Sequence, residues 1–265
     1  MKWSHKSPPT LLLAAIFFTS ACALHRSVEH ENVPGLGRFE FREAADGLEG
    51  IVIGAPHGRT DRLSDSLAKS ISDRTGAGLA IAYGFKSKRL GVSQPVVRSR
   101  TYPVSVSSSQ RGSVFKEYKK VLRKAAKGEI DLYIGVHRSS DKEAADRIEV
   151  ATSGLTFEEA RALKEAYAHI RDQLTEGKQV PKLIMAIEPL DRIFWRASGV
   201  KHHGVLLVAE KGLNLRIPQM LSLEPAERLY TVILSRWVDE ALKLLRENPL
   251  GLPQIQVRLV DLGRF

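Results

Sequence analysis

Cysteine is almost absent from this chain, which carries only Cys22 among 265 residues. A single cysteine excludes an intrachain disulfide, whereas exported proteins stabilised by disulfides normally have an even number. Long hydrophobic runs are missing too. The apolar stretch at residues 11–18 is far too short to cross a bilayer. The chain has neither a Walker loop nor a Gly-x-Gly-x-x-Gly fingerprint, which leaves a nucleotide cofactor without support.

The beginning of the chain has the features of bacterial export. Residues 1–6 are basic and polar, residues 11–18 are apolar, and small residues lead to Cys22. This order predicts a signal peptide over residues 1–21. The residues before Cys22 resemble the lipobox of bacterial lipoproteins, although Thr19 stands where leucine is usual. The resemblance implies a diacylated (palmitate-bearing) N-terminal Cys22; ordinary cleavage after Ala21, with Cys22 as a spare thiol, is the alternative.

A lipidated Cys22 implies a protein that is exported and anchored to the membrane of the bacterial cell envelope. Ala23 follows Cys22, and lipoproteins resembling this one are kept from the outer membrane mainly by Asp there. We therefore expect outer-membrane anchoring, facing the periplasm, in a cell with two membranes. Loss of Lys2 and Lys6 lowers the formal net charge from +10 to +8. This charge favours anionic lipid headgroups or cell-wall polymers as partners, and no nucleic acid is expected outside the cytoplasm.

The rest of the chain alternates between apolar runs and helical patterns. Residues 22–48 are polar and broken by proline and glycine, so we expect a lipidated tether that leads into the domain. Residues 49–265 predict a single α/β domain with a mixed, largely parallel sheet flanked by helices. Strands are expected at 51–56, 79–83, 102–106, 132–136, 148–151, 182–187, 205–209 and 255–259, with an edge or half-exposed strand at 213–217. Helices are expected around 63–71, 113–127, 156–174 and 225–247.

Two histidines directly follow predicted strands. His57 comes after residues 51–56, and His137 after residues 132–136. Ligands of open α/β sheets bind outside the carboxyl ends of the strands, so both imidazoles are expected to face one cleft. Asp61, four residues after His57, can turn its carboxylate back beside the imidazole. Two imidazoles and a carboxylate are the protein ligands of a hydrolytic zinc site.

Each of these residues also has an ordinary structural interpretation. A histidine at a strand end commonly forms surface hydrogen bonds, and Asp61 alone can cap a helix. The adjacent His202 and His203 are predicted to lie in a solvated turn. Neighbours in a strand point to opposite faces, so at most one of that pair could enter a site.

The order of these segments resembles the N-formylglutamate amidohydrolase-like proteins, relatives of the zinc carboxypeptidases. The likeness covers most of residues 50–240 and runs through 55–61, 83–85, 133–137, 148–152, 187–191 and 213–218. It implies one zinc ion, held by His57, Asp61 and His137, that activates water against an amide. It also implies an arginine that holds a substrate carboxylate and a glutamate that moves protons. The substrate would be a small molecule or peptide with an amide next to a carboxylate.

The substrate side of the pattern is altered. Where the family carries an Asn-Arg pair for the carboxylate, residues 107–111 read Ser-Ser-Ser-Gln-Arg. Arg111, Arg98 and Arg100 are the candidate replacements, because a guanidinium binds a carboxylate through two hydrogen bonds. Glu188 and Glu210, each near a predicted strand end, are the candidate proton carriers, with a structural role as the alternative for each.

Three further departures concern the metal. Gly135 stands where relatives tend to carry Glu, and Asn214 and Arg216 stand where a His and a Glu alternate. A positive Arg216 aimed at the metal is expected to weaken cation binding.

Two functions follow from these residues. The first is a lipid-anchored, zinc-dependent amidohydrolase or carboxypeptidase-like hydrolase. The second is a catalytically inactive relative that binds an anionic ligand or a partner protein at the cell envelope. A serine hydrolase built on the serines of 105–109 has less support, because that segment lacks a Gly-x-Ser-x-Gly elbow.

Overall fold

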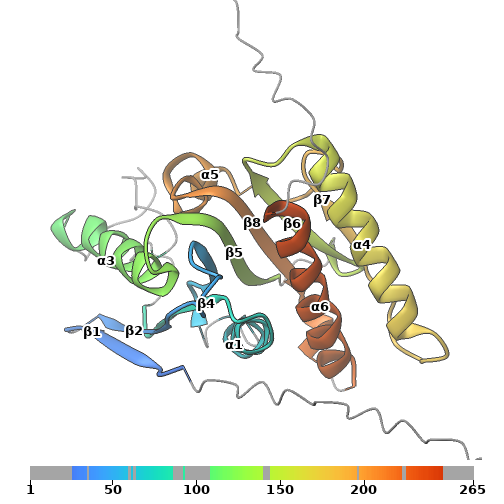
Figure 1. Ribbon diagram of the computed structural model, residues 1–265, viewed down its shortest axis with the longest axis horizontal. Helices are drawn as coiled ribbons and strands as arrows, with labels where there is room; N and C mark the ends of the chain where they lie inside the picture. The colour runs from blue at the N-terminus through green and yellow to red at the C-terminus, as the bar shows by residue number, and fades with distance from the viewer. Residues whose placement is uncertain are drawn as a thin grey trace, which may run out of the picture.

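An eight-stranded sheet with the strand order β1-β2-β4-β3-β5-β8-β6-β7 forms the centre of the protein (Figure 1). The computed structural model describes residues 26–34, 36–58, 61, 64–85, 92, 108–139, 144–195, 197–222 and 225–246. The strands are β1 (Glu29–Val33), β2 (Gly37–Arg42), β3 (Ile51–Ala55), β4 (Gly78–Tyr83), β5 (Ile130–Ser139), β6 (Arg147–Ser153), β7 (Ile184–Ile187) and β8 (Ala209–Pro218).

The four central strands β4, β3, β5 and β8 are parallel to one another. β7 is parallel to β6, β6 runs antiparallel to β8, and β1 and β2 add an antiparallel ribbon to β4. The predicted single α/β domain with a mixed, largely parallel sheet is therefore confirmed. The carboxyl ends of the four parallel strands meet at one end of the sheet, which we call the carboxyl end, and this is where such folds bind ligands.

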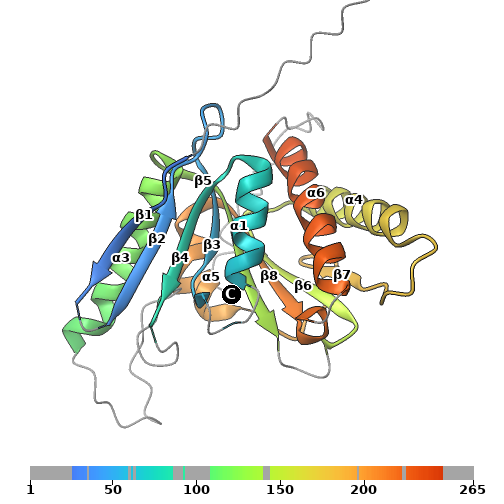
Figure 2. The same cartoon turned by 90° about the horizontal axis from the view of Figure 1, so that it is seen from below.

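Helices cover both faces of the sheet (Figures 1 and 2). One face carries α1 (Ser64–Thr75), α4 (Phe157–Thr175) and α6 (Ala226–Arg246), and the other carries α3 (Ser108–Ala126), α5 (Ser198–His203) and the 3-10 turn η3 (Val205–Leu207). A short 3-10 turn, η4 (Gln219–Ser222), follows β8. Each face has its own hydrophobic core, so the sheet is buried on both sides.

The predicted start of α4 is confirmed in detail. The backbone N–H of Glu159 donates to Thr156 Oγ1 at 3.1 Å, and the backbone N–H of Thr156 donates to Glu159 Oε2 at 2.9 Å. These reciprocal bonds form a capping box and satisfy two N–H groups that the first turn of a helix cannot pair internally.

The segment predicted as a tether contains strands β1 and β2. Phe39 and Phe41 of β2 are buried under α3, and β2 pairs with β4. Arg26 donates hydrogen bonds to the carbonyl oxygens of Ser72, Gly76 and Ala77 at the end of α1. The chain is therefore packed onto the domain from Arg26 onward, because two phenylalanines supply enough apolar surface to outweigh the nearby proline and glycines.

One strand prediction in the second half is wrong, and another is correct as a strand but wrong in its place in the sheet. Residues 205–207 form η3, whose Val205 and Leu206 are buried in the core on the α3 side. A short apolar run does not distinguish a strand from a buried helical turn. Residues 213–217 belong to β8, which lies between β5 and β6 rather than at an edge. Its alternating polar residues face a site and not bulk water, as described below.

Several sequence predictions lie outside the described residues: the signal peptide, Cys22, the strands at 102–106 and 255–259, Arg98 and Arg100. Within the described part of the chain, no helix combines the length and apolar character needed to cross a membrane.

Candidate metal centre

A tight turn places His57 at the carboxyl end of the sheet. His57 lies two residues beyond the end of β3, and Gly58 follows with a positive φ of +40°. A β-carbon on Gly58 would lie 2.3 Å from the carbonyl oxygen of Ala82 on β4, so only glycine fits this turn. Asp61 lies just before α1, and its carbonyl accepts hydrogen bonds from the backbone N–H and the hydroxyl of Ser64 at the start of that helix.

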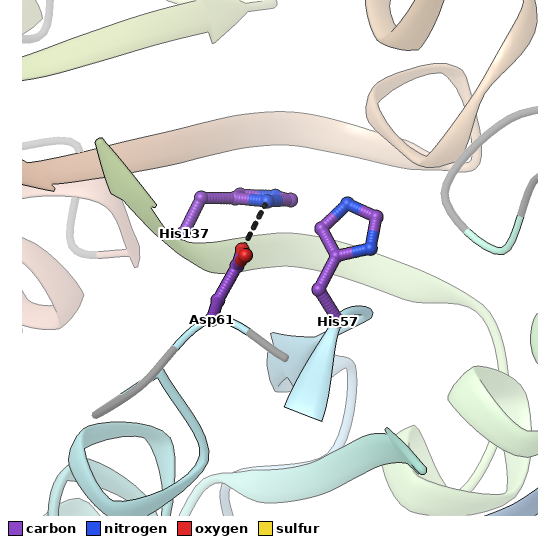
Figure 3. A group of neighbouring side chains, drawn as sticks. All are labelled: His57, Asp61 and His137. Carbon is purple, nitrogen blue, oxygen red and sulfur yellow. Dashed lines mark ion pairs between the residues drawn. The ribbon is translucent and has the colours of Figure 1, made fainter. Parts of the chain in front are cut away.

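Three predicted ligands converge at this end of the sheet (Figure 3). His137 lies near the end of β5, and ligand atoms of His57, Asp61 and His137 all lie within 4.8 Å of one another. Asp61 Oδ2 is 3.9 Å from His137 Nδ1, and the two imidazole rings are 5.1 Å apart in an edge-to-face arrangement. Within the described ranges, this is the one group of His, Cys, Asp and Glu side chains with such a geometry.

The environment keeps both imidazoles neutral. Burial lowers the pKa of His57, with Asp61 acting in the opposite direction. Burial also lowers the pKa of His137 well below its usual value; charges on His57 and Arg216 act in the same direction, and Asn214 opposes them. A neutral imidazole offers the lone pair that a metal requires, so no proton has to be displaced at neutral pH.

The donor set fits zinc. Zinc accepts imidazole nitrogen and carboxylate oxygen at about 2.0–2.2 Å, which puts tetrahedral ligand atoms about 3.4 Å apart. The 3.9 Å between Asp61 and His137 is therefore close to the separation required. The buried Nδ1 of His57 and Nε2 of His137 find no hydrogen-bond partner among the described residues. Buried nitrogens without a partner are costly, and a metal ion or its water would satisfy one of them.

Asn214 lies beneath the histidines as a buried neighbour of His137. Its side chain is 0% exposed, and neither amide atom has a hydrogen-bond partner within the described part of the chain. It lies close enough to His137 to raise the pKa of that imidazole. Because Nδ1 of His137 faces Asp61, the Nε2 proton is the one for which Asn214 Oδ1 is a candidate acceptor.

A row of polar side chains crosses the sheet beside the histidines. His137 on β5 is the register partner of Arg216 on β8, and Arg216 is the register partner of Glu149 on β6. We call His57, His137, Arg216 and Glu149 the polar row. Arg216 Nη1 is 3.7 Å from Glu149 Oε2, and its guanidinium lies over the ring of Trp195, 5.6 Å from the centroid. Trp195 in turn packs against His137, with ring centroids 5.5 Å apart.

The predicted conflict between Arg216 and a metal is reduced by Glu149. This carboxylate is 0% exposed and lies beside the guanidinium on the side away from His137. An opposite charge within a few ångströms offsets most of the field of Arg216 at the neighbouring strand. A cation held by the two histidines and Asp61 is therefore compatible with Arg216.

The two predicted proton carriers, Glu188 and Glu210, do not lie beside the histidines. Glu210 is an exposed residue at the start of β8, six positions before Arg216 and so about 20 Å from it along the strand. Glu188 follows β7, three strands from β5, and forms an ion pair with Lys201 while accepting the backbone N–H of Thr152 at 3.2 Å. Both border predicted strands, but Glu210 lies at the amino end of β8, and Glu188 is separated from β5 by the width of three strands.

The remaining candidates are placed only in part. The backbone of Arg111 lies in the first turn of α3, and α3 runs from the carboxyl end of β4 back toward the start of β5. His202 and His203 are both exposed on α5, solvated as predicted but in a helix rather than a turn.

Sequence reasoning missed two members of this site. Glu149 is a fully buried acid inside the apolar run 148–151, and a charge within such a run is a signal that it has a buried partner. Trp195 lies in an irregular segment after β7, and nothing in its local sequence indicated a place beside His137.

No protein-family model matches the sequence, and no curated protein matches it significantly. Solved structures share part of its arrangement. A gene product of Agrobacterium tumefaciens is 14% identical, with 79% of this chain and 94% of that chain covered and a TM-score of 0.47. A bacteriophage poly-gamma-glutamate hydrolase is 13% identical, with 80% and 91% covered and a TM-score of 0.45. A metallo-carboxypeptidase from Burkholderia cenocepacia is 10% identical, with 83% and 65% covered and a TM-score of 0.43. At these values none of them indicates what this chain binds or catalyses.

Proposed function

We propose that the protein is a zinc-dependent hydrolase that cleaves an amide lying next to a carboxylate. The observation that carries the proposal is the convergence of His57, Asp61 and His137 at the carboxyl end of the sheet, with ligand atoms within 4.8 Å of one another. When bound, zinc supplies Lewis acidity toward an amide carbonyl and lowers the pKa of water. The protein's own contribution is to keep both imidazoles neutral and to hold His137 on a buried strand and His57 on the turn after β3.

We further propose that the enzyme works at the bacterial cell envelope, anchored through a lipid on Cys22 and facing the periplasm. The support is the order of basic, apolar and small residues that leads to Cys22. Arg26 contacts the end of α1 only four residues later, so an extended chain between the two spans about 14 Å. The anchor would therefore hold the domain close to the membrane surface. Metabolic labelling with a palmitate analogue tests this: wild type is labelled and Cys22→Ala is not.

Hydrolysis is tested with a panel of N-acyl amino acids and cell-wall peptides, each assayed with zinc and with excess chelator. We expect release of a free amine that requires zinc and is lost in Asp61→Asn, which keeps the shape of the side chain but weakens it as a ligand. Activity that persists in chelator, or in Asp61→Asn, would contradict the proposal.

The alternative is an inactive relative that binds an anionic ligand or a partner protein. It is favoured by one observation: Glu188 and Glu210, the predicted proton carriers, lie away from the histidines. Ligand binding that persists in chelator, without turnover of any substrate in the panel, would support it over hydrolysis.

A further inference from the structure

The sheet has a second place where parallel strands end in loops. β6 and β7 are parallel to each other, but β6 runs antiparallel to β8. Their carboxyl ends therefore lie at the end of the sheet opposite the histidines, and carboxyl ends of parallel strands are where such folds bind ligands. Ser153 of β6 is the register partner of Gly212, four residues before Arg216, so it lies about 13 Å along the sheet from the polar row.

An open pocket with a volume of about 450 Å³ lies at these two carboxyl ends. It is lined by residues 152–155 at the end of β6, by residues 188, 189 and 191 after β7, and by Lys201 of α5. This volume is within the range of small-molecule sites. None of the lining residues is one of the candidate metal ligands, so a ligand held here would not occupy the metal centre.

Two ion pairs border the pocket. Lys201 Nζ pairs with Glu188 Oε2, which also accepts the backbone N–H of Thr152 at 3.2 Å. Lys164 Nζ, from α4, lies 2.6 and 2.7 Å from the two carboxylate oxygens of Asp191. The side chains of Lys201 and Glu188 are each 21% exposed, so this pair has little access to bulk water. The charges of the four groups sum to zero, so neither a cation nor an anion is strongly favoured as a ligand.

Paired charges of this kind suit a ligand with adjacent hydroxyl groups. An ammonium has three N–H donors and a carboxylate has about four acceptor positions, so the bond between Lys201 and Glu188 leaves further capacity on both groups. One hydroxyl of a vicinal diol can accept from the ammonium while its neighbour donates to the carboxylate, and no charge is added. Ser153 contributes a hydroxyl that can donate or accept. A saccharide ring carries several such diols in a fixed arrangement, which lowers the entropy cost of binding.

We propose that this pocket binds an uncharged saccharide. Lys201 and Glu188 would bond to adjacent hydroxyls of the sugar ring, and Ser153 to a further one. The inference goes beyond the proposed hydrolytic function, because the pocket and the metal centre lie at opposite ends of the sheet. Binding here is not a step of the hydrolysis, so turnover at the histidines does not depend on it.

The test is sugar binding to the full chain, measured by saturation-transfer NMR in a detergent without a sugar headgroup. The probes are the methyl glycosides of glucose, galactose and mannose, which together present adjacent hydroxyls in both cis and trans arrangements. Glucuronate and glucosamine are the charged controls. We expect wild type to bind at least one neutral glycoside about tenfold or more tightly than either charged sugar, because the added charge would be desolvated without a partner.

Two variants locate the binding. Lys201→Met keeps the length of the side chain but removes the ammonium, and should weaken binding of the preferred glycoside about tenfold. Ser153→Tyr fills part of the pocket while leaving both ion pairs in place, and should abolish binding. Lys120→Met is the matched control, because Lys120 also pairs with a glutamate, Glu117, but on the exposed surface of α3. Urea denaturation shows whether each variant is folded; if Lys201→Met is not, Ser153→Tyr decides.

Loss of binding in Ser153→Tyr, with wild-type affinity in Lys120→Met, would support the inference. It would be overturned if none of the three neutral glycosides bound saturably, if a charged sugar bound more tightly, or if Ser153→Tyr kept wild-type affinity. An oligosaccharide of the preferred sugar distinguishes two sources of the ligand. Tighter binding than the monosaccharide indicates a glycan chain, equal affinity indicates a free sugar, and both support the site. Zinc content has no bearing on these outcomes, so the inference and the hydrolytic proposal can fail separately.

Discussion

Asn214 on β8 occupies the space above Gly135 on β5: a β-carbon on Gly135 would lie 2.4 Å from Asn214 Oδ1 and 3.0 Å from the ring of Tyr133. The two residues are register partners. A side chain at position 135 would therefore compete with Asn214 for the same space. The two positions are coupled in the floor of the site.

That coupling predicts a non-additive pair of substitutions. Gly135→Ala should lower the free energy of unfolding by about 1–3 kcal/mol, because the added methyl overpacks a filled space. In an Asn214→Ala background the same change should cost clearly less, since the obstructing amide is gone. Urea denaturation of the four proteins measures both effects. Equal costs of Gly135→Ala in the two backgrounds would show that Asn214 does not fill this space.

Asn214 should also orient His137 for the metal. Replacing it with leucine, which has a similar size but no hydrogen-bonding atom, should weaken zinc affinity about 10–100-fold. Asn214→Asp should retain or strengthen zinc binding, since a carboxylate is the stronger partner of a ligating imidazole. Competition with a chromophoric chelator gives both affinities. Wild-type affinity in Asn214→Leu would rule out this role.

The two imidazoles should make the metal-free protein sensitive to acid. Burial lowers the pKa of His57 and His137 below the usual 6.5, so between those folded-state values and 6.5 the unfolded chain binds more protons than the folded one. The stability they contribute is complete above pH 6.5 and is lost as the pH falls, by up to about 1.4 kcal/mol per pH unit for each histidine.

His137→Gln should therefore flatten the dependence of unfolding free energy on pH below 6.5. Urea denaturation of chelated protein at a series of pH values provides the measurement. His202→Gln, at an exposed position on α5, serves as the control and should match wild type. A wild-type slope in His137→Gln would mean that this imidazole does not titrate on unfolding as described.

Glu188 and Glu210 should be dispensable for the chemistry. Both lie away from the carboxyl end of the parallel strands, and Glu188 is engaged with Lys201 and Thr152. Glu188→Gln and Glu210→Gln should each keep zinc stoichiometry and, with any substrate found, keep kcat/KM within about twofold of wild type. A loss of 100-fold or more in kcat at unchanged stability would restore the residue concerned as a proton carrier.

The sequence predicted the frame of the fold because its buried strands are nearly continuous apolar runs. β3, β4 and β5 could be located this way, and the start of α4 could be located from the capping-box spacing of Thr156 and Glu159. β8 could not be placed, because Asn214 and Arg216 give it the alternation of a half-exposed strand while facing a site inside the protein. Polar residues that break the local rules are expected where a site is built.

The candidate metal ligands were predictable, and their surroundings were not. His57 and His137 each follow an apolar run. Such a run identifies the end of a strand even when the order of the strands in the sheet is unknown. Glu149 and Trp195 join the site only because β6 lies beside β8 and the segment after β7 folds back over it. Such non-local pairing leaves no pattern in a single sequence.

Zinc content is the most direct test of the central claim that His57, Asp61 and His137 form a metal site. The full chain, purified without a polyhistidine tag or chelator, is compared by elemental analysis with His57→Ala and His137→Ala, and with His202→Ala as the control. We predict about one zinc per chain in wild type and in the control, and none in the other two. Wild-type protein that stays metal-free after zinc is supplied, or zinc that persists in both His57→Ala and His137→Ala, would contradict the account.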